Sequence, residues 1–350
     1  MASARGKKRL SLALQGGGSH GAFTWGALDR LLEDADVEID AVSGTSAGAL
    51  NGAVLANALK TGSRTSAREA LERFWRSVSE AGNRVFKPGR VMAIPPAGWN
   101  VDSSPLTILE EMVALVWSPY DNPFYRNVLE DLIQKAIPDF TALNREGAPR
   151  LFVCATQVKT NERKIFAAGE ISVKALAASA CLPNLFQAVE VNGQFYWDGG
   201  YMGNPALSPL LAKELPSDIA IVWINPLQQT ELPLRAREII DRLNDVTFNS
   251  VLVQEIKGVE TVNNMLERGV LRDPEEKYKS IYLHTIADEE NLRPLGYASK
   301  RTTDWQFLQS LRDLGRAAAD KWLRTEREKI GRRPSADVKE ILSRLGSRGR

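Results

Sequence analysis

The stretch Ala41-Val42-Ser43-Gly44-Thr45-Ser46-Ala47-Gly48-Ala49-Leu50 decides the fold. Apolar residues run up to a G-x-S-x-G pattern, and small, helix-forming residues follow it to Leu59. This order predicts a β-strand, a sharp turn and an α-helix, with Ser46 at the apex of the turn. Such a turn needs neighbours without bulky side chains, and Gly44 and Gly48 meet this need at the two ends of the nucleophile elbow.

The predicted turn places two sources of positive partial charge beside the Ser46 hydroxyl. The amide of Ala47 and the N-terminus of the following helix both lie where a negatively charged oxygen would develop during attack on a carbonyl. The pattern therefore indicates a nucleophilic serine. A small-residue turn that only packs a helix on a sheet is the alternative.

A cluster of glycines follows the first predicted strand, residues 9–15. A helix over 22–33 and a second strand over 37–42 come next, and the second strand leads into the serine turn. Strand, glycine loop, helix and strand begin an open α/β sheet, in which ligands bind at the carboxyl ends of the strands. Both motifs fall at this edge.

The glycine loop fits two functions. Gly16, Gly18 and Gly21 match the dinucleotide-binding spacing, but that fingerprint requires an acidic residue at the end of the second strand, where this chain has the serine turn. The lysine of a P-loop is also missing. Three consecutive glycines expose backbone amides beside a helix N-terminus, so we favour an oxyanion hole formed by Gly16, Gly17 and Gly18.

Composition narrows the class of protein. A chain of 350 residues with 43% hydrophobic and 25% charged residues is typical of a globular protein of one or two domains. The net charge of +2 gives no support for nucleic-acid binding. Cys154 and Cys181 lie in apolar surroundings and form neither a disulfide framework nor a metal pattern. We expect a cytoplasmic chain without a signal peptide or a membrane span.

Two further segments suggest the domain organisation. Residues 82–124 hold apolar runs interrupted by prolines, which fits either an irregular subdomain over the sheet or an apolar lid above Ser46. Residues 324–350 are basic, with apolar side chains on one helical face. This fits a docked terminal helix or peripheral contact with an anionic membrane. We predict a catalytic domain over 8–290 and a helical extension over 291–350.

A serine nucleophile needs a base, and the chain has only two histidines. His20 lies in the glycine loop, too close to the expected oxyanion donors to be an obvious base. His284 lies near the end of the last predicted strand, residues 280–286. It would complete the order Ser46, Asp198, His284, which is the chain order of the α/β-hydrolase triad. A structural histidine at a strand end is the alternative.

Asp198 is the other candidate base. It follows a predicted strand over 194–197 and precedes two glycines, which remove steric bulk around it. A carboxylate is a weak base at its ordinary pKa, so it must lie within hydrogen-bonding reach of the hydroxyl and be partly desolvated. An aspartate that only caps a turn is the alternative. The residues by themselves leave the choice between Asp198 and His284 open.

Three motifs in this order resemble those of the patatin-like phospholipase family. They are Gln15-Gly16-Gly17-Gly18-Ser19-His20-Gly21, Gly44-Thr45-Ser46-Ala47-Gly48 and Asp198-Gly199-Gly200. The resemblance covers about residues 10–211. It implies a three-layer α/β/α fold with a central, mostly parallel sheet, and hydrolysis of fatty-acyl esters of phospholipids or lysophospholipids. It also implies a Ser46–Asp198 dyad and oxyanion donors at Gly16, Gly17 and Gly18. No metal or other cofactor is expected, because the sequence has no histidine-carboxylate cluster or cysteine pair with ligand spacing.

The chain departs from the family pattern at two positions. His20 stands where the family commonly has arginine or lysine, so this loop is not expected to carry a permanent positive charge near the oxyanion or a lipid phosphate. Gly200 replaces the alanine that often ends the aspartate motif. A Ser46-Asp198-His284 esterase, an acyl-carrier transferase and a catalytically silent lipid- or protein-binding relative stay open, and no oligomeric state is predicted.

Overall fold

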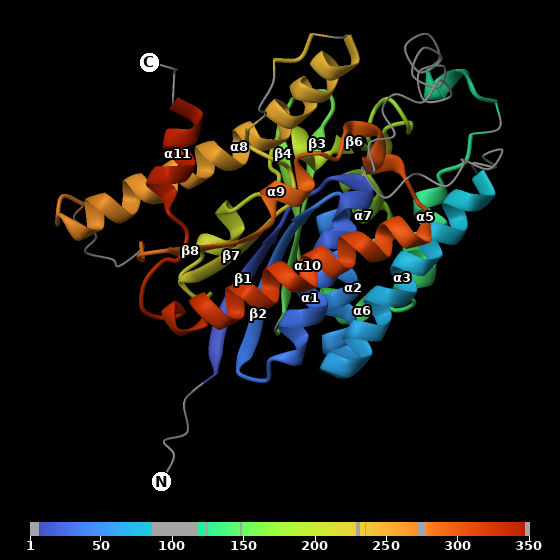
Figure 1. The fold of residues 1–350 in the computed structure, drawn as a ribbon. Helices are drawn as coiled ribbons and strands as arrows, with labels where there is room; N and C mark the ends of the chain where they lie inside the picture. Colours follow the sequence, from blue (N-terminus) through green and yellow to red (C-terminus); the bar gives the residue numbers. More distant parts are fainter. Residues whose placement is uncertain are drawn as a thin grey trace.

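Eight β-strands form one sheet at the centre of the protein (Figure 1). The computed structural model describes residues 7–85, 118–228 and 232–346, apart from residues 124, 148, 235 and 272–277. Within these residues the strand order is β5-β6-β3-β2-β1-β7-β8, and β4 pairs with β3. The strands are β1 (Lys8–Leu14), β2 (Val37–Thr45), β3 (Arg150–Gln157), β4 (Arg163–Phe166), β5 (Val189–Val191), β6 (Gln194–Asp198), β7 (Asp218–Trp223) and β8 (Tyr282–Ala287).

Most of the sheet is parallel. The neighbours β3, β2, β1, β7 and β8 all run in one direction. The strands β4, β5 and β6 form antiparallel pairs at one end. The strand β7 is buried along its whole length and apolar after Asp218, as expected for a strand covered on both faces. The predicted α/β class with a mostly parallel sheet is confirmed.

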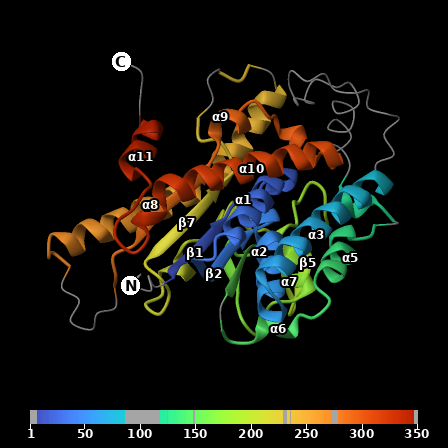
Figure 2. The ribbon, with the colours of Figure 1, turned by 60° about the horizontal axis from the view of Figure 1, so that its bottom comes forward.

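Helices cover both faces of the sheet (Figures 1 and 2). One layer contains α1 (Gly21–Glu33), α2 (Ala47–Thr61), α3 (Arg64–Val85), α5 (Val128–Ala136), α6 (Thr141–Asn144), α7 (Val173–Ser179) and α10 (Trp305–Glu326). The opposite layer contains α8 (Ala236–Glu267), α11 (Val338–Gly346) and the single-turn helix η4 (Ser208–Leu211). The short helices at loops and strand ends are η1 (Gly18–His20), η2 (Pro119–Asp121), η3 (Gly199–Tyr201), α9 (Glu289–Leu292), η5 (Tyr297–Arg301) and η6 (Arg327–Lys329).

Each face of the sheet has its own hydrophobic core. Ala220 and Val222 of β7 belong to the cluster under α1 and α10, whereas Ile219 and Ile221 belong to the cluster under α8. This alternation follows from the two-residue period of a strand. The predicted three-layer α/β/α arrangement is therefore confirmed.

The helices α1 and α10 pack with their backbones in contact. A Cβ atom on Gly26 would clash with the carbonyl of Arg312, and one on Gly315 would clash with the carbonyl of Phe23. Asp29 of α1 also forms an ion pair with Arg316. The helix α10 lies in the C-terminal segment 291–350, so this segment shares the core of the rest of the chain.

Gly315→Ala is expected to lower the free energy of unfolding by about 1–3 kcal/mol, because the added methyl group forces two packed backbones apart. Gly258→Ala is the matched control, since Gly258 also lies inside a helix and a Cβ atom there meets nothing within 4 Å. This control is expected to stabilise the protein by about 0.5–1 kcal/mol. Urea unfolding of both variants measures the difference. Equal shifts in the two midpoints would contradict the close packing.

The structure describes the predicted basic segment at the C-terminus but little of the predicted lid. Most of the predicted lid over 82–124 lies outside the described residues, since these stop at residue 85 and resume at residue 118. In the basic C-terminal segment, Val338 of α11 is buried in the core under α8, and Ile341 and Leu342 pack against it. The apolar face of α11 is therefore docked on the protein itself. Among the described helices, none combines the length and the apolar character needed to cross a bilayer.

Candidate active site

Ser46 stands alone between the last residue of β2 and the first residue of α2. Its φ of 54° lies in the region that side chains other than glycine rarely adopt, which is the strained geometry of a strand-to-helix turn. A Cβ atom on Gly48 would clash with the carbonyl of Leu14, and one on Gly44 would lie 2.6 Å from the Gly48 carbonyl oxygen. Glycines at these two positions therefore permit the tight turn.

The turn is held from a neighbouring helix. The backbone amide of Ser46 donates a hydrogen bond to Oγ of Ser179 in α7, at 3.0 Å. Ser46 is 9% exposed, so most of this residue is shielded from solvent. This arrangement presents a single hydroxyl at the carboxyl end of β2, where ligands bind in open α/β sheets.

Strand register places Ser46 and Asp198 at the same height in the sheet. In the pair of β2 and β3, Thr45 is level with Cys154. In the pair of β3 and β6, the next residue, Ala155, is level with Asp198. Ser46 follows Thr45, so it lies level with Asp198, with β3 between the two strands. Both residues line one cavity of about 30 Å³.

The Asp198 carboxyl group is buried and only 1% exposed. Its Oδ1 accepts a hydrogen bond from the Gly200 amide at 2.7 Å, and its Oδ2 has no hydrogen-bond partner among the described residues. Burial raises the pKa of Asp198 to about 7, and interactions with the Gly200 amide and the Ser46 side chain oppose this rise. A carboxylate that titrates near neutral pH has the basicity that proton transfer from a hydroxyl requires.

The glycine loop lies beside the same cavity, but its three amides are not equivalent. The Gly16 amide donates to Oδ1 of Asn204 at 2.6 Å, so in this structure it already has an acceptor. Gly16 was one of the three predicted oxyanion donors, and its assignment as a donor stays a prediction. Among the residues that the structure describes, the Gly17 and Gly18 amides donate to no protein acceptor. They and the Ala47 amide are the remaining candidate donors.

Four amide side chains hold the glycine loop in place. Gln15 accepts hydrogen bonds from the amides of Ile224 and Asn225 and donates to the Asn204 carbonyl and to Oδ1 of Asn249. The side chain of Asn225 donates to the Gly16 carbonyl at 2.8 Å. We did not predict these roles from the sequence. Gln15 lies within the quoted loop motif, and Asn204 follows the aspartate motif closely, but no local pattern shows that their side chains hold the glycine loop.

Asn204→Ala is expected to lower kcat/KM for ester hydrolysis by about 10–100-fold, because a misplaced glycine loop weakens alignment with the reacting carbonyl. Asn57→Ala is a matched control. Asn57 is also buried and donates one hydrogen bond, to the Asp139 carbonyl at 2.7 Å, far from Ser46 in the fold. Kinetics and thermal unfolding are measured for both variants. The same loss of activity in both would assign the Asn204 effect to stability.

The two histidines lie in different places. His20 is fully buried, and its Nε2 lies 2.7 Å from Oγ of Ser299. Burial and the nearby Lys300 lower the pKa of His20 to about 3, so this side chain is neutral at neutral pH. His284 lies within β8, where Nε2 contacts Oδ1 of Asp218 at 2.9 Å and Nδ1 contacts Oγ of Ser335 at 2.8 Å.

The structure does not bring His284 to Ser46. In the strand order, β1 and β7 separate β8 from β2. His284 pairs with Ala220 in the interior of β7, below the carboxyl edge of the sheet, and it does not line the Ser46 cavity. The alternative Ser46-Asp198-His284 triad is therefore wrong for this arrangement, because both imidazole nitrogens face other residues.

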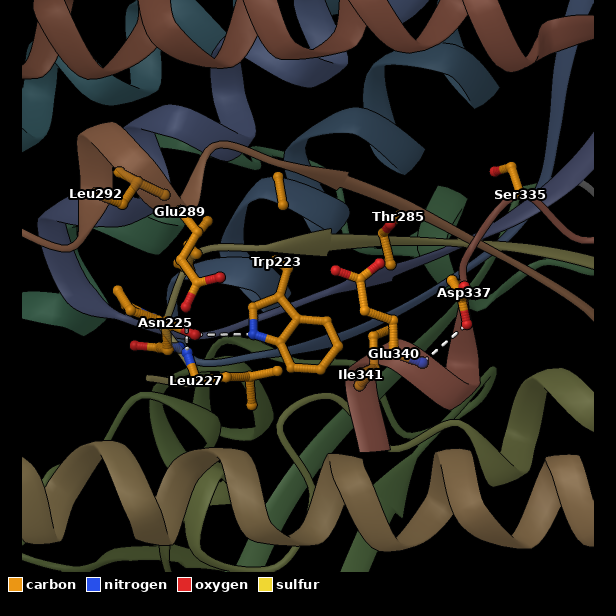
Figure 3. Close-up of a pocket in the computed structure, with 13 residues that line it drawn as sticks. Trp223, Asn225, Leu227, Thr285, Glu289, Leu292, Ser335, Asp337, Glu340 and Ile341 are labelled. Atoms are coloured by element: carbon orange, nitrogen blue, oxygen red, sulfur yellow. Dashed lines mark hydrogen bonds between the residues drawn. The ribbon is translucent and has the colours of Figure 1, made fainter. Parts of the chain in front are cut away.

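A larger cavity of about 280 Å³ lies beside the carboxyl ends of β7 and β8. Figure 3 shows Trp223 at its centre, with its Nε1 donating to the Asn225 carbonyl at 2.8 Å, and Glu340 of α11 at one side. Ser46 and Asp198 do not line this cavity. Ile224 and Asn225, which line it, also lie against Gly17 of the glycine loop. Within the described residues, no group of three or more His, Cys, Asp or Glu side chains could hold a metal ion.

The fold and the site define a class: α/β proteins with a serine on a strand-to-helix turn beside a glycine-rich loop. Residues 12–211 match the model of the family described as Patatin-like phospholipase. This match covers more than half of the chain, so the chain belongs to the patatin-like phospholipases, a family of lipid hydrolases. No curated protein sequence matches the chain.

Two solved proteins are similar in structure. VipD from Legionella pneumophila is 16% identical, with a TM-score of 0.35, and the match covers 89% of this chain and 72% of VipD. The ExoU–SpcU complex of the Pseudomonas aeruginosa type III secretion system gives 18% identity and a TM-score of 0.35, over 70% of this chain and 51% of the matched chain. A second structure of that complex gives 13% identity and a TM-score of 0.34, over 91% of this chain and 54% of the matched chain. This chain thus spans about half the length of the chain it matches in that complex.

Proposed function

We propose that this protein is a serine acyl hydrolase that cleaves fatty-acyl esters of phospholipids or lysophospholipids with a Ser46–Asp198 dyad. One observation carries the proposal: the strand register brings Ser46 and Asp198 level in one buried cavity beside the glycine loop. Membership of the patatin-like phospholipases supports the lipid ester as the substrate class.

The proposed reaction has two acyl-transfer steps. Asp198 takes the proton of Ser46 as Oγ attacks the ester carbonyl, and the Gly17, Gly18 and Ala47 amides stabilise the negatively charged oxygen. The bond to the alcohol breaks as Asp198 returns the proton to the leaving oxygen, which leaves an acyl group on Ser46. Water then attacks this acyl group as Asp198 takes a proton from it, the bond to Ser46 Oγ breaks, Asp198 returns the proton to Oγ, and a fatty acid leaves.

The direct test is hydrolysis of short and long p-nitrophenyl esters and of a phospholipid by the wild-type protein, with a chelator present. We expect turnover of the esters and the phospholipid, and no effect of the chelator, because the proposed steps use only protein groups. Absence of turnover across this series of substrates would overturn the proposal.

That absence would favour a catalytically silent lipid-binding relative. The size of the Ser46 cavity, about 30 Å³, favours this second candidate, since a fatty-acyl chain is much larger. Leu182 and Phe248 line the cavity, and we expect an acyl chain to displace these side chains as it enters. Faster turnover of short esters than of long ones would show that this wall limits the enzyme.

His284→Ala separates the dyad from a histidine-dependent mechanism. We expect activity per folded molecule to stay within about 3-fold of wild type, while the free energy of unfolding falls by about 1–3 kcal/mol because Asp218 loses a buried partner. Activity is measured below the unfolding temperature of the variant, and unfolding is followed by circular dichroism. A folded but inactive variant would overturn the dyad.

A further inference from the structure

Two consecutive basic residues from the C-terminal part of the chain line the cavity that holds Ser46. Lys300 and Arg301 form the end of η5 and lie outside residues 12–211, which match the family. Besides Asp198, they are the charged residues among those that line this cavity. The site therefore includes two basic side chains from a segment that the three sequence motifs do not include.

The helix η5 is fixed to the glycine loop by several contacts. A Cβ atom on Gly18 would clash with the Lys300 carbonyl, so the two backbones touch. Ser299, the residue before Lys300, contacts His20 of the loop through their side chains at 2.7 Å. Arg301 is therefore carried by a backbone that is held against the proposed oxyanion donors.

Lys300 is held on both sides of its ammonium group. Its Nζ donates to Oδ1 of Asn225 at 2.9 Å and forms an ion pair with Asp245 at 3.0 Å. The side chain of Lys300 is buried, and the Asp245 carboxylate balances its charge. Lys300 is thus a positioning residue that anchors η5 between the glycine loop and α8.

Arg301 has a different environment. Its side chain is only partly buried. The Arg301 guanidinium is therefore a permanently charged group on the cavity wall that solvent can reach. His20 supplies no charge here, because burial keeps it neutral. A guanidinium group binds phosphate through two parallel hydrogen bonds, and in a glycerophospholipid only the glycerol separates the phosphate from the acyl esters.

We propose that Arg301 binds the phosphate group of the substrate and so selects phosphate-bearing acyl esters over neutral ones. This inference rests on the proposed acyl hydrolase function. The ester carbonyl lies at Ser46, the phosphate lies at Arg301 on the cavity wall, and the rest of the head group extends toward solvent. Selection follows because a neutral acylglycerol offers the guanidinium no phosphate oxygens to bind.

The test compares two substrates that differ only in the head group: short-chain phosphatidylglycerol and diacylglycerol with the same acyl chains, in the same neutral detergent micelles. We expect Arg301→Gln to lower the ratio of kcat/KM for phosphatidylglycerol to that for diacylglycerol by about 10–100-fold. Arg301→Lys is expected to recover part of this ratio, since it keeps the charge but loses the two-point contact.

Arg324→Gln is the matched control. Arg324 lies on α10, its side chain is 74% exposed, and it pairs with Asp320. The substitution Arg324→Gln therefore removes one positive charge from the protein surface and leaves the Ser46 cavity unchanged. Its ratio is expected to equal that of wild type. An equal fall in the ratio for both variants would overturn the inference, since general attraction to anionic micelles would then explain it. An unchanged ratio in Arg301→Gln would also overturn it, while leaving acyl hydrolysis intact.

A binding measurement keeps the inference testable if turnover fails. Calorimetry of Ser46→Ala with short-chain phosphatidylglycerol below its micellar concentration gives the affinity without hydrolysis. We expect the double variant Ser46→Ala, Arg301→Gln to bind about 10-fold more weakly. Equal affinities would overturn the role of Arg301 whatever the outcome for acyl hydrolysis, and an inactive wild type that shows this difference would overturn only the proposed function.

Discussion

Ser46→Ala is expected to lower the rate of ester hydrolysis by about 10⁴-fold or more, because alanine has no oxygen to form the acyl-enzyme. With wild type, a p-nitrophenyl ester that deacylates slowly should give a burst of product equal to the enzyme concentration, and mass spectrometry should find one acyl group on Ser46. Both signals are expected to vanish in the variant.

Ser11→Ala is the matched control for the nucleophile. Ser11 lies fully buried in β1, and its hydroxyl has no hydrogen-bond partner among the described residues. Loss of this hydroxyl is expected to leave the rate unchanged. If Ser46→Ala keeps more than about one hundredth of the wild-type rate, the acyl group is carried by another residue or by none.

Asp198→Asn is expected to lower kcat by about 10³–10⁴-fold, because an amide accepts no proton from Ser46. In the wild-type protein, kcat/KM should rise with pH through about 7 and then level off, since burial raises the pKa of Asp198 to about 7 and the reaction needs the ionised form. Asp218→Asn is the control, because Asp218 is buried but lies outside the Ser46 cavity. It should keep this pH profile.

Asp198→Asn is expected to raise the stability of the protein although it lowers the activity. The folded protein holds the Asp198 proton up to about pH 7, whereas the unfolded chain releases it near its ordinary value of 3.8. Wild type therefore loses stability as pH rises between these two values, and the loss is complete above pH 7. Asparagine does not titrate, so Asp198→Asn should gain up to about 4 kcal/mol relative to wild type between pH 4 and pH 8. A constant difference between the two proteins would contradict the raised pKa.

The sequence predicted the elements that depend on local patterns. The strand, turn and helix around Ser46 followed from an apolar run, two glycines and a helix-forming segment, and the structure contains them. Where a helix begins can depend on a single polar contact: α5 begins at Val128, after the Asn127 side chain, which caps the helix by accepting a hydrogen bond from the Leu129 amide.

The parts of the site that could not be predicted depend on register and on distant contacts. No pattern near Gly16 shows that its amide bonds Asn204, which lies 188 residues later. Ser46 and Asp198 lie level only because β2 pairs with β3 in one register and β3 pairs with β6 in another. The sequence of a single strand does not determine the register of its pairing with another strand. Lys300 and Arg301 read as ordinary basic residues until η5 is seen against the glycine loop. The predicted roles of Ser46 and Asp198 stay predictions until the variants are measured.

The contact between η5 and the glycine loop has a consequence for how the protein loses activity on heating. Gly18 meets the backbone of Lys300, and α10, which follows η5, packs against α1, which follows the loop. The glycine loop and α10 are thus joined twice, and we expect them to open as one cooperative unit. Heat inactivation should therefore coincide with global unfolding. The rate of hydrogen exchange in α10 should also predict the temperature at which the glycine loop loses its structure.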